Sequence, residues 1–192
     1  MHPLSPPQYS HDEQDTLLDL ARKSIHYHFD NKAYLPIHAE DYSKNLQKRR
    51  ACFVTLRKQQ VLRGCIGGLE ANQALVYEVV ERACDAAFHD PRFYPVKREE
   101  FAQLHIHISV LGQLHQMEIS DRKELLQQIR PHYDGLVVED GTNRGTFLPA
   151  VWEALPDPEK FVEQLMCKAD LPPDHWSPNI RVYRYNCTSF GD

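Results

Sequence analysis

The chain has 192 residues, 42% of them hydrophobic, and a formal net charge of -5. This length supplies enough core for one large domain or two small ones, and the negative charge argues against a bulk electrostatic grip on nucleic acid or anionic membranes. No apolar run reaches the roughly 18 residues that a membrane helix needs, and the N-terminus lacks the apolar region of a signal peptide. We expect a cytoplasmic globular protein that binds neither nucleic acid nor membrane.

The first half of the chain shows clear helix and strand patterns. Residues 1–9 contain three prolines and are expected to be a flexible tail. Ser10 and Glu13 have the spacing of a capping box, and apolar residues follow with a helical period, which predicts an amphipathic helix over 11–29. The other elements expected here are a hairpin of strands near 51–56 and 61–69, a helix capped by Asn72 and ending at Phe88, and a strand at 104–111.

The second half repeats this alternation of strands and helices. Asp121 is expected to cap a helix that runs to Ile129, and Asp157 followed by Pro158 marks another helix start. Strands are expected at 136–139, 145–148 and 180–186. Because the connections are too short for most parallel crossovers, the sequence predicts an α+β fold with a largely antiparallel sheet.

The stretch Val61–Leu69 contains the most informative candidate residues. With the period-2 alternation of a strand, Arg63 and Cys65 share one face. Gly64 and Gly67 bring no side chain, which suggests a bulge, a bend or the close approach of another group, and leaves the thiol accessible. The alternative is that Cys65 is a small buried hydrophobe and that the glycines turn a sheet corner.

A second short motif, Asp90-Pro91-Arg92-Phe93, follows the predicted helix. The residue before a proline is disfavoured in the α region, so the helix should end here. Asp90 is a good turn residue, and its carboxylate could hold either Arg92 or a ligand. The motif alone does not decide between a surface turn and a binding site.

The cysteines and histidines give no indication of a bound metal. The five cysteines are an odd number without a C-x-x-C pair, so neither a disulfide framework nor a zinc knuckle is expected. His105 and His107 would project together from one strand, but no third ligand stands at a recognisable spacing. The G-x-S-x-G, P-loop and G-x-G-x-x-G motifs are absent. We expect reduced thiols, no metal and no cofactor.

Four motifs in order resemble the AMMECR family, which includes the "AmmeMemoRadiSam system protein A" proteins. They are LRGCIGG at 62–68, AAFHDPRFYPV at 86–96, ISVL at 108–111 and DGLVVEDGTNRGTFLPAVW at 134–152. The resemblance implies a barrel-like sheet built from two related β/α repeats with flanking helices. It also implies a single domain over 10–192, with a larger and a smaller lobe around a cleft lined by the Arg63 to Gly67 motif. The family has no settled biochemical activity.

Two functional hypotheses follow from these motifs. In the first, Cys65 is a nucleophile or transient acceptor that acts on a small molecule or modified side chain, and Arg63 lowers the pKa of its thiol. Asp90 or Arg92 would hold a polar substrate, and the ligand-binding set would be completed by Gly64, Gly67 and Phe93. In the second, the same cleft is a non-catalytic binding module. The family name implies a Memo-like protein and a radical-SAM protein as partners in either case.

The position of each cysteine predicts how readily it reacts. Cys52, Cys84 and Cys167 fall in elements expected to form the core, and Cys187 lies near the C-terminus. Cys65 is therefore expected to be the most reactive of the five thiols in the folded protein.

Overall fold

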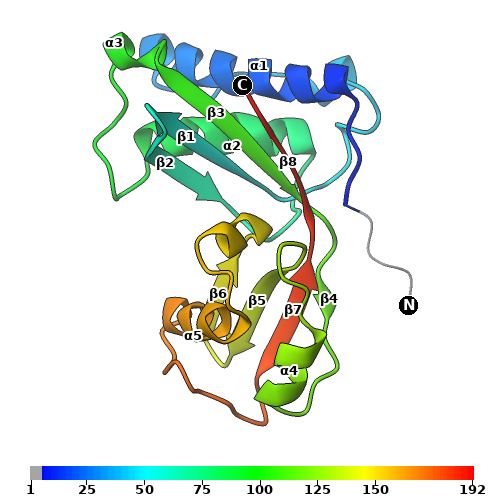
Figure 1. Cartoon of the computed structure of the whole chain (residues 1–192). Helices are drawn as coiled ribbons and strands as arrows, with labels where there is room; N and C mark the ends of the chain where they lie inside the picture. The colour runs from blue at the N-terminus through cyan, green and yellow to red at the C-terminus, as the bar shows by residue number, and fades with distance from the viewer. Residues whose placement is uncertain (1–5) are drawn as a thin grey trace. The chain divides into compact units, whose positions relative to one another are not determined.

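The computed structural model describes residues 6–192, which form two compact units (Figure 1). The N-terminal unit consists of Pro7–Leu111 together with Thr188–Asp192, and the C-terminal unit consists of Gly112–Cys187 with Pro6. Each unit has its own four-stranded sheet. The predicted arrangement as one domain with two lobes around a cleft stays a prediction.

The sheet of the N-terminal unit has the strand order β2-β1-β3-β8. Its strands are β1 (Cys52–Lys58), β2 (Val61–Gly67), β3 (Leu104–Leu111) and β8 (Cys187–Gly191). The helices of this unit are α1 (His11–Asn31), η1 (Ala39–Asp41), α2 (Leu75–Phe88) and α3 (Arg98–Phe101). Buried apolar side chains of α1, α2, β1 and β3 belong to one core cluster, so the two long helices cover one face of the sheet.

The two long helices begin for different reasons. At α1 the predicted capping box is confirmed, because Ser10 accepts from the Glu13 N–H and Glu13 accepts from the Ser10 N–H. At α2 the predicted cap, Asn72, is wrong: the helix starts after Ala74, which makes no side-chain cap. The first N–H groups of α2 instead donate to backbone carbonyls of the loop that precedes β1, at 3.0 Å from Leu75 to Lys48. A tertiary contact thus satisfies the donors that a local cap would have taken.

The hairpin of β1 and β2 has a tight turn and one irregularity. Gln59 and Gln60 both have positive φ, 50° and 66°, as a type I′ turn requires. The pairing then shifts register between Leu56 and Arg57, which leaves Arg63 as the extra residue of a β-bulge. The strict alternation expected along this strand is therefore interrupted at Arg63.

The C-terminal unit has the strand order β4-β7-β5-β6. Its elements are β4 (His115–Gln116), α4 (Arg122–Gln128), β5 (Gly135–Asp140), β6 (Asn143–Phe147), η2 (Pro149–Glu153), α5 (Pro158–Lys168) and β7 (Arg181–Tyr185). Asp121 and Asp157 cap α4 and α5 as predicted. The rings of Trp152 and Phe161 stack at 3.7 Å in the core, and the Trp152 indole N–H donates to the Asp134 carbonyl.

The α+β class and the antiparallel character of the sheets are confirmed, but the predicted barrel-like sheet is wrong. Neither four-stranded sheet of residues 6–192 closes on itself, so each retains two edge strands. The strand predicted at 180–186 is confirmed as β7, but the sequence did not predict β8, which follows after Asn186 and belongs to the other sheet. Continuous β-rich sequence gives no sign of this change of sheet at Asn186, because both strands have the same local preference.

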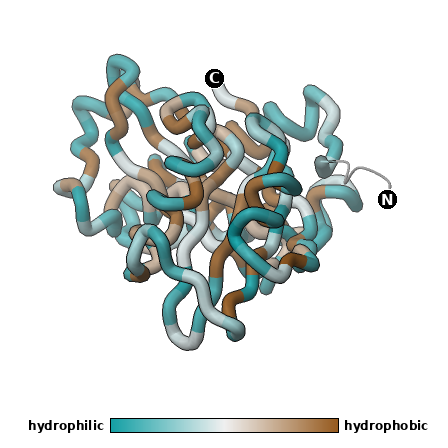
Figure 2. The backbone as a smooth tube through the Cα atoms, turned by 60° about the horizontal axis from the view of Figure 1, so that its bottom comes forward, coloured by the Kyte–Doolittle hydropathy of each residue, from teal (hydrophilic) through white to brown (hydrophobic). Residues whose placement is uncertain are grey.

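Residues 1–5 of the flexible tail predicted over 1–9 lie outside the described residues. Beyond it, the Pro7 and Gln8 carbonyls accept hydrogen bonds from Thr188 and Asn45, and the buried Tyr9 ring packs near Phe190. Hydrophilic residues prevail in the outer loops (Figure 2). Within the described part of the chain, no helix combines the length and the apolar character that crossing a membrane requires.

Candidate functional site

The orientation of Cys65 is set by its two strand neighbours. Gly64 faces α2 so closely that a Cβ built on it would lie 2.0 Å from the Ala86 carbonyl oxygen. Cys65 therefore faces the other side of the sheet, opposite Thr55 of β1. The Thr55 hydroxyl donates to the Cys65 sulfur at 3.2 Å, and the Cys65 residue is partly exposed. Of the two readings left open by the sequence, the structure favours the accessible thiol over the buried hydrophobe.

The backbone of Cys65 is held from the edge of the sheet by the Asp90-Pro91-Arg92 turn. The Cys65 N–H donates to Asp90 Oδ2 at 2.8 Å, and its carbonyl accepts from the Arg92 guanidinium at 3.0 Å. Since β2 is an edge strand, these two side chains satisfy the groups that a neighbouring strand would otherwise bind. We call this arrangement the edge clamp: Asp90 and Arg92 bound to the Cys65 backbone.

Charge neutralisation within the edge clamp makes it rigid. Arg92 binds Asp90 through Nε at 2.9 Å and through a terminal nitrogen at 2.7 Å, and the Asp90 side chain is 2% exposed. The Arg92 hydrogen bond, helped by the Cys65 N–H, holds the pKa of Asp90 well below its usual range against the opposing effect of burial. The pKa of Arg92 is raised, chiefly by Asp90 and to a smaller extent by the Cys65 thiol.

Arg63 contacts a residue that the sequence did not single out. Its guanidinium donates to Glu100 Oε1 at 2.7 Å and to Oε2 at 3.3 Å. Lys58 reaches the same carboxylate at 3.2 Å. The Arg63 hydrogen bond is the main reason that the pKa of Glu100 is lowered to about 2. Arg63 is thus paired with Glu100, just as Arg92 is paired with Asp90, and its expected action on the thiol stays a prediction.

Glu100 could not have been found from a sequence motif. It lies in α3, a four-residue helix that the hydrophobic pattern did not predict, and 37 residues separate it from Arg63. The only local signal was a pair of adjacent glutamates, which is common on exposed helices.

The remaining predicted site residues pack around the edge clamp. The Arg92 guanidinium lies 5.5 Å from the centre of the Phe93 ring, and the Phe93 N–H closes the turn on the Asp90 carbonyl. Gly67 lies against the Phe53 ring of β1. The structure thus gathers Cys65, Asp90, Arg92 and Phe93 and diverts Arg63 to Glu100.

The other cysteines differ from Cys65 in their surroundings. Cys52 and Cys84 are buried as predicted, and burial raises the pKa of both thiols, that of Cys84 to about 12. The Cys84 sulfur lies 3.2 Å from Nδ1 of His28. The prediction for Cys167 is wrong: it is exposed, because it lies on the side of α5 opposite the buried Phe161, Val162, Leu165 and Met166.

The histidine pair on β3 has no metal-site geometry. His105 is exposed and its ring lies 3.3 Å from the Asp192 backbone oxygen. Across residues 6–192 there is no group of three or more His, Cys, Asp or Glu side chains arranged to hold a metal ion.

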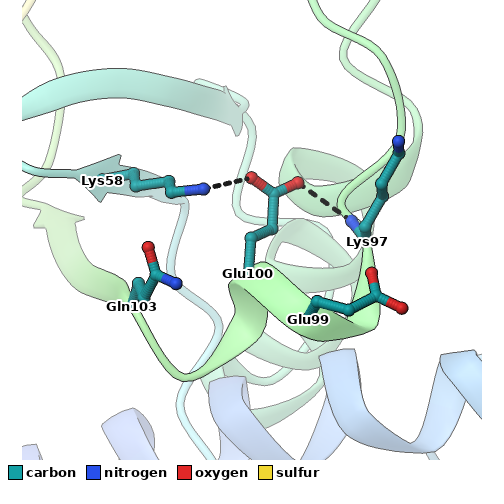
Figure 3. Close-up of a pocket in the computed structure, with 5 residues that line it drawn as sticks. All are labelled: Lys58, Lys97, Glu99, Glu100 and Gln103. Carbon is teal, nitrogen blue, oxygen red and sulfur yellow. Dashed lines mark hydrogen bonds and ion pairs between the residues drawn. The ribbon is translucent and has the colours of Figure 1, made fainter.

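A shallow, open pocket of about 380 Å³ adjoins the Arg63–Glu100 pair. Figure 3 shows its lining residues, which are Lys58, Lys97, Glu99, Glu100 and Gln103. Glu100 occupies the centre, where Lys58 binds one oxygen and the Lys97 backbone N–H binds the other.

Comparison with known proteins identifies the family. The AMMECR1 family model matches residues 18–190. A protein of Methanothermobacter thermautotrophicus is 38% identical over 187 residues, covering 94% of this chain and 95% of the relative. The protein MJ0810 of Methanocaldococcus jannaschii is 36% identical, with 79% and 77% of the two chains covered. The crystal structure of the uncharacterized protein PH0010 from Pyrococcus horikoshii aligns with a TM-score of 0.85 at 34% identity, over 92% of this chain and 90% of that one. This chain therefore belongs to the AMMECR1 family.

Proposed function

We propose that this protein acts through Cys65 as a thiol nucleophile toward an electrophilic group of a small molecule or a modified side chain. The proposal rests on two features that occur together at Cys65. The Cys65 backbone is fixed at both its N–H and its carbonyl by the edge clamp, while the residue is partly exposed and its sulfur accepts a hydrogen bond from Thr55. A buried structural cysteine needs neither feature.

Polar groups surround Cys65. The Thr55 hydroxyl donates to its sulfur at 3.2 Å, and the Arg92 guanidinium donates to its carbonyl at 3.0 Å. In the proposed step the thiol loses its proton to water and the sulfur bonds to the electrophilic carbon. The bond to the leaving group breaks, and that group departs with the bonding electron pair and takes up a proton from water.

Acylation by p-nitrophenyl acetate tests the proposal. The full chain is incubated with the ester at pH 7 to 8, and the modified residue is located by mass spectrometry. We expect one acetyl group on Cys65, with release of p-nitrophenol, and loss of this reaction in Cys65→Ser. The matched control is Cys167→Ser, which removes an exposed thiol that lacks the edge clamp and should leave the reaction unchanged. A Cys65 thiol that stays unmodified until the protein is unfolded would refute the proposal.

A second candidate function, a non-catalytic binding module, is supported by the charge pairing. Asp90 neutralises Arg92 and Glu100 neutralises Arg63, so these side chains form a preorganised surface rather than a free acid or base. In this case the partners would be the Memo-like and radical-SAM proteins that the family name suggests. Co-purification with either partner that persists in Cys65→Ala would favour the module. A Cys65 thiol that stays unreactive in the folded wild-type protein, together with that binding, would exclude the enzyme.

A further inference from the structure

The pocket beside the Arg63–Glu100 pair is lined by charged side chains of both signs in a chain that is negative overall. Two lysines, Lys58 and Lys97, line it together with two carboxylates, Glu99 and Glu100, and Arg63 binds Glu100 from outside this lining. The lining is therefore neutral, against a formal net charge of -5 for the whole chain. Arg98, which lies between Lys97 and Glu99, is paired with Asp30.

Glu100 organises these cations without remaining available to a ligand. Its Oε1 accepts from Arg63 at 2.7 Å and from the Lys97 N–H at 2.9 Å. Its Oε2 accepts from Lys58 at 3.2 Å and from Arg63 at 3.3 Å. With a pKa near 2 it stays ionised at neutral pH. The carboxylate thus fixes the positions of Lys58 and Arg63, and its own accepting capacity is filled.

The groups left to meet a ligand are mainly hydrogen-bond donors. An ammonium group has three donor hydrogens, so Lys58 retains two beyond its bond to Glu100. Lys97 binds Glu100 through its backbone, and its ammonium extends away from that carboxylate (Figure 3). The Gln103 amide, on the side of Lys58, supplies further donors. Positively charged hydrogen-bond donors in a concave site recognise an anion.

We propose that this pocket binds a small molecule through one anionic group, a carboxylate or a phosphate. The volume of about 380 Å³ lies in the range of small-ligand sites, roughly 300–1,000 Å³. The Glu99 carboxylate on the rim opposes a second anionic group, which favours a ligand with a single one. The inference goes beyond the proposed function, because it holds whether or not Cys65 reacts.

Chemical-shift titration of the ¹⁵N-labelled full chain tests the site. The probes are sodium acetate and sodium methyl phosphate, each compared with sodium chloride at equal ionic strength. We expect saturable shifts confined to Lys58 and residues 97–103 with at least one of the two anions, and none with the neutral analogue acetamide. The anion with the stronger response identifies the carboxylate or the phosphate as the preferred group. The absence of saturable shifts with both anions would overturn the proposal.

Variants that change one charge distinguish anion binding in this pocket from nonspecific electrostatic attraction to the protein surface. Lys97→Gln should weaken anion binding roughly tenfold by removing one charged donor, and Glu99→Gln should strengthen it. Lys123→Gln, which removes an exposed lysine of α4, is the control and should change nothing. Cys65→Ala should abolish thiol chemistry and leave anion binding intact, so the two proposals can fail independently. Equal effects of Lys97→Gln and Lys123→Gln would contradict a built site.

Discussion

Asp90 accepts the backbone N–H of Cys65 at 2.8 Å, although 25 residues separate the two in the chain. The carboxylate replaces the carbonyl of a neighbouring strand, and Arg92 replaces the N–H of that strand by donating to the Cys65 carbonyl. The edge of the sheet is thereby closed at the one residue whose side chain carries the proposed chemistry.

Asp90→Asn should destabilise the protein by roughly 2–3 kcal/mol, because it replaces a buried, charge-assisted acceptor and leaves Arg92 without its counter-ion. Urea unfolding followed by circular dichroism measures the change. Asp15→Asn is the matched control, since Asp15 is an exposed residue of α1. Equal stability of the two variants would show that the edge clamp contributes no net stabilisation.

The free energy of unfolding should fall as the pH drops from about 4.5 toward 2. The pKa of Glu100 is lowered from 4.5 to about 2 in the folded protein, and the pKa of Asp90 is lowered as well. A carboxylate with a depressed pKa contributes stability above its unfolded pKa and loses that contribution as the pH falls through the folded value.

Glu100→Gln measures how much of the loss of unfolding free energy at low pH is due to Glu100. At 1.36 kcal/mol per pKa unit, the carboxylate contributes at most roughly 3 kcal/mol at neutral pH. The variant should be less stable than the wild type at pH 7 and should show a flatter decline between pH 4.5 and 2. A variant with the same pH profile as the wild type would rule out this assignment.

Gly64→Ala should cost roughly 3 kcal/mol of stability, because the new methyl group would lie 2.0 Å from the backbone oxygen of Ala86. That atom belongs to α2 and can move only if the helix shifts. Gly68→Ala is the control, since a Cβ at Gly68 meets nothing within 4 Å. Thermal unfolding of both variants checks the prediction, and a stable Gly64→Ala protein would place α2 farther from β2.

Thr55→Val should slow the alkylation of Cys65 by iodoacetamide at pH 7 about threefold, because the hydroxyl that donates to the sulfur is lost. The rate at exposed Cys167, measured in the same sample by mass spectrometry, serves as an internal control and should not change. Cys52 and Cys84 should be labelled only after unfolding. An unchanged rate at Cys65 would mean that Thr55 contributes to packing alone.

Replacement of Gln59-Gln60 by Asn-Gly should stabilise the hairpin by about 0.5–1 kcal/mol, since both positions have positive φ. These two residue types adopt that conformation more easily than glutamine does. The denaturation midpoint should rise, with the slope against urea unchanged. A lower midpoint would indicate that the glutamine side chains make contacts that the turn geometry does not require.

Local patterns in the sequence determined those parts of the structure that depend on neighbouring residues. The capping box at Ser10 defines the start of α1, and Asp157 with Pro158 defines the start of α5. The glycine beside Cys65 indicated close approach of another element, which is α2. In each case the signal lies within a few residues of the feature that it predicts, and intrinsic preference is sufficient.

Only the tertiary structure decided the partners of the charged residues and the arrangement of the strands. The sequence placed Arg63 beside the thiol, and the structure shows that its guanidinium binds Glu100, 37 residues away. Asp90 could have held a ligand, but it binds the Cys65 backbone. β7 and β8 follow each other with one residue between them and still join different sheets, so no barrel forms. Ion pairs and strand pairs between distant segments carry no local signature, because each depends on where the rest of the chain has already packed.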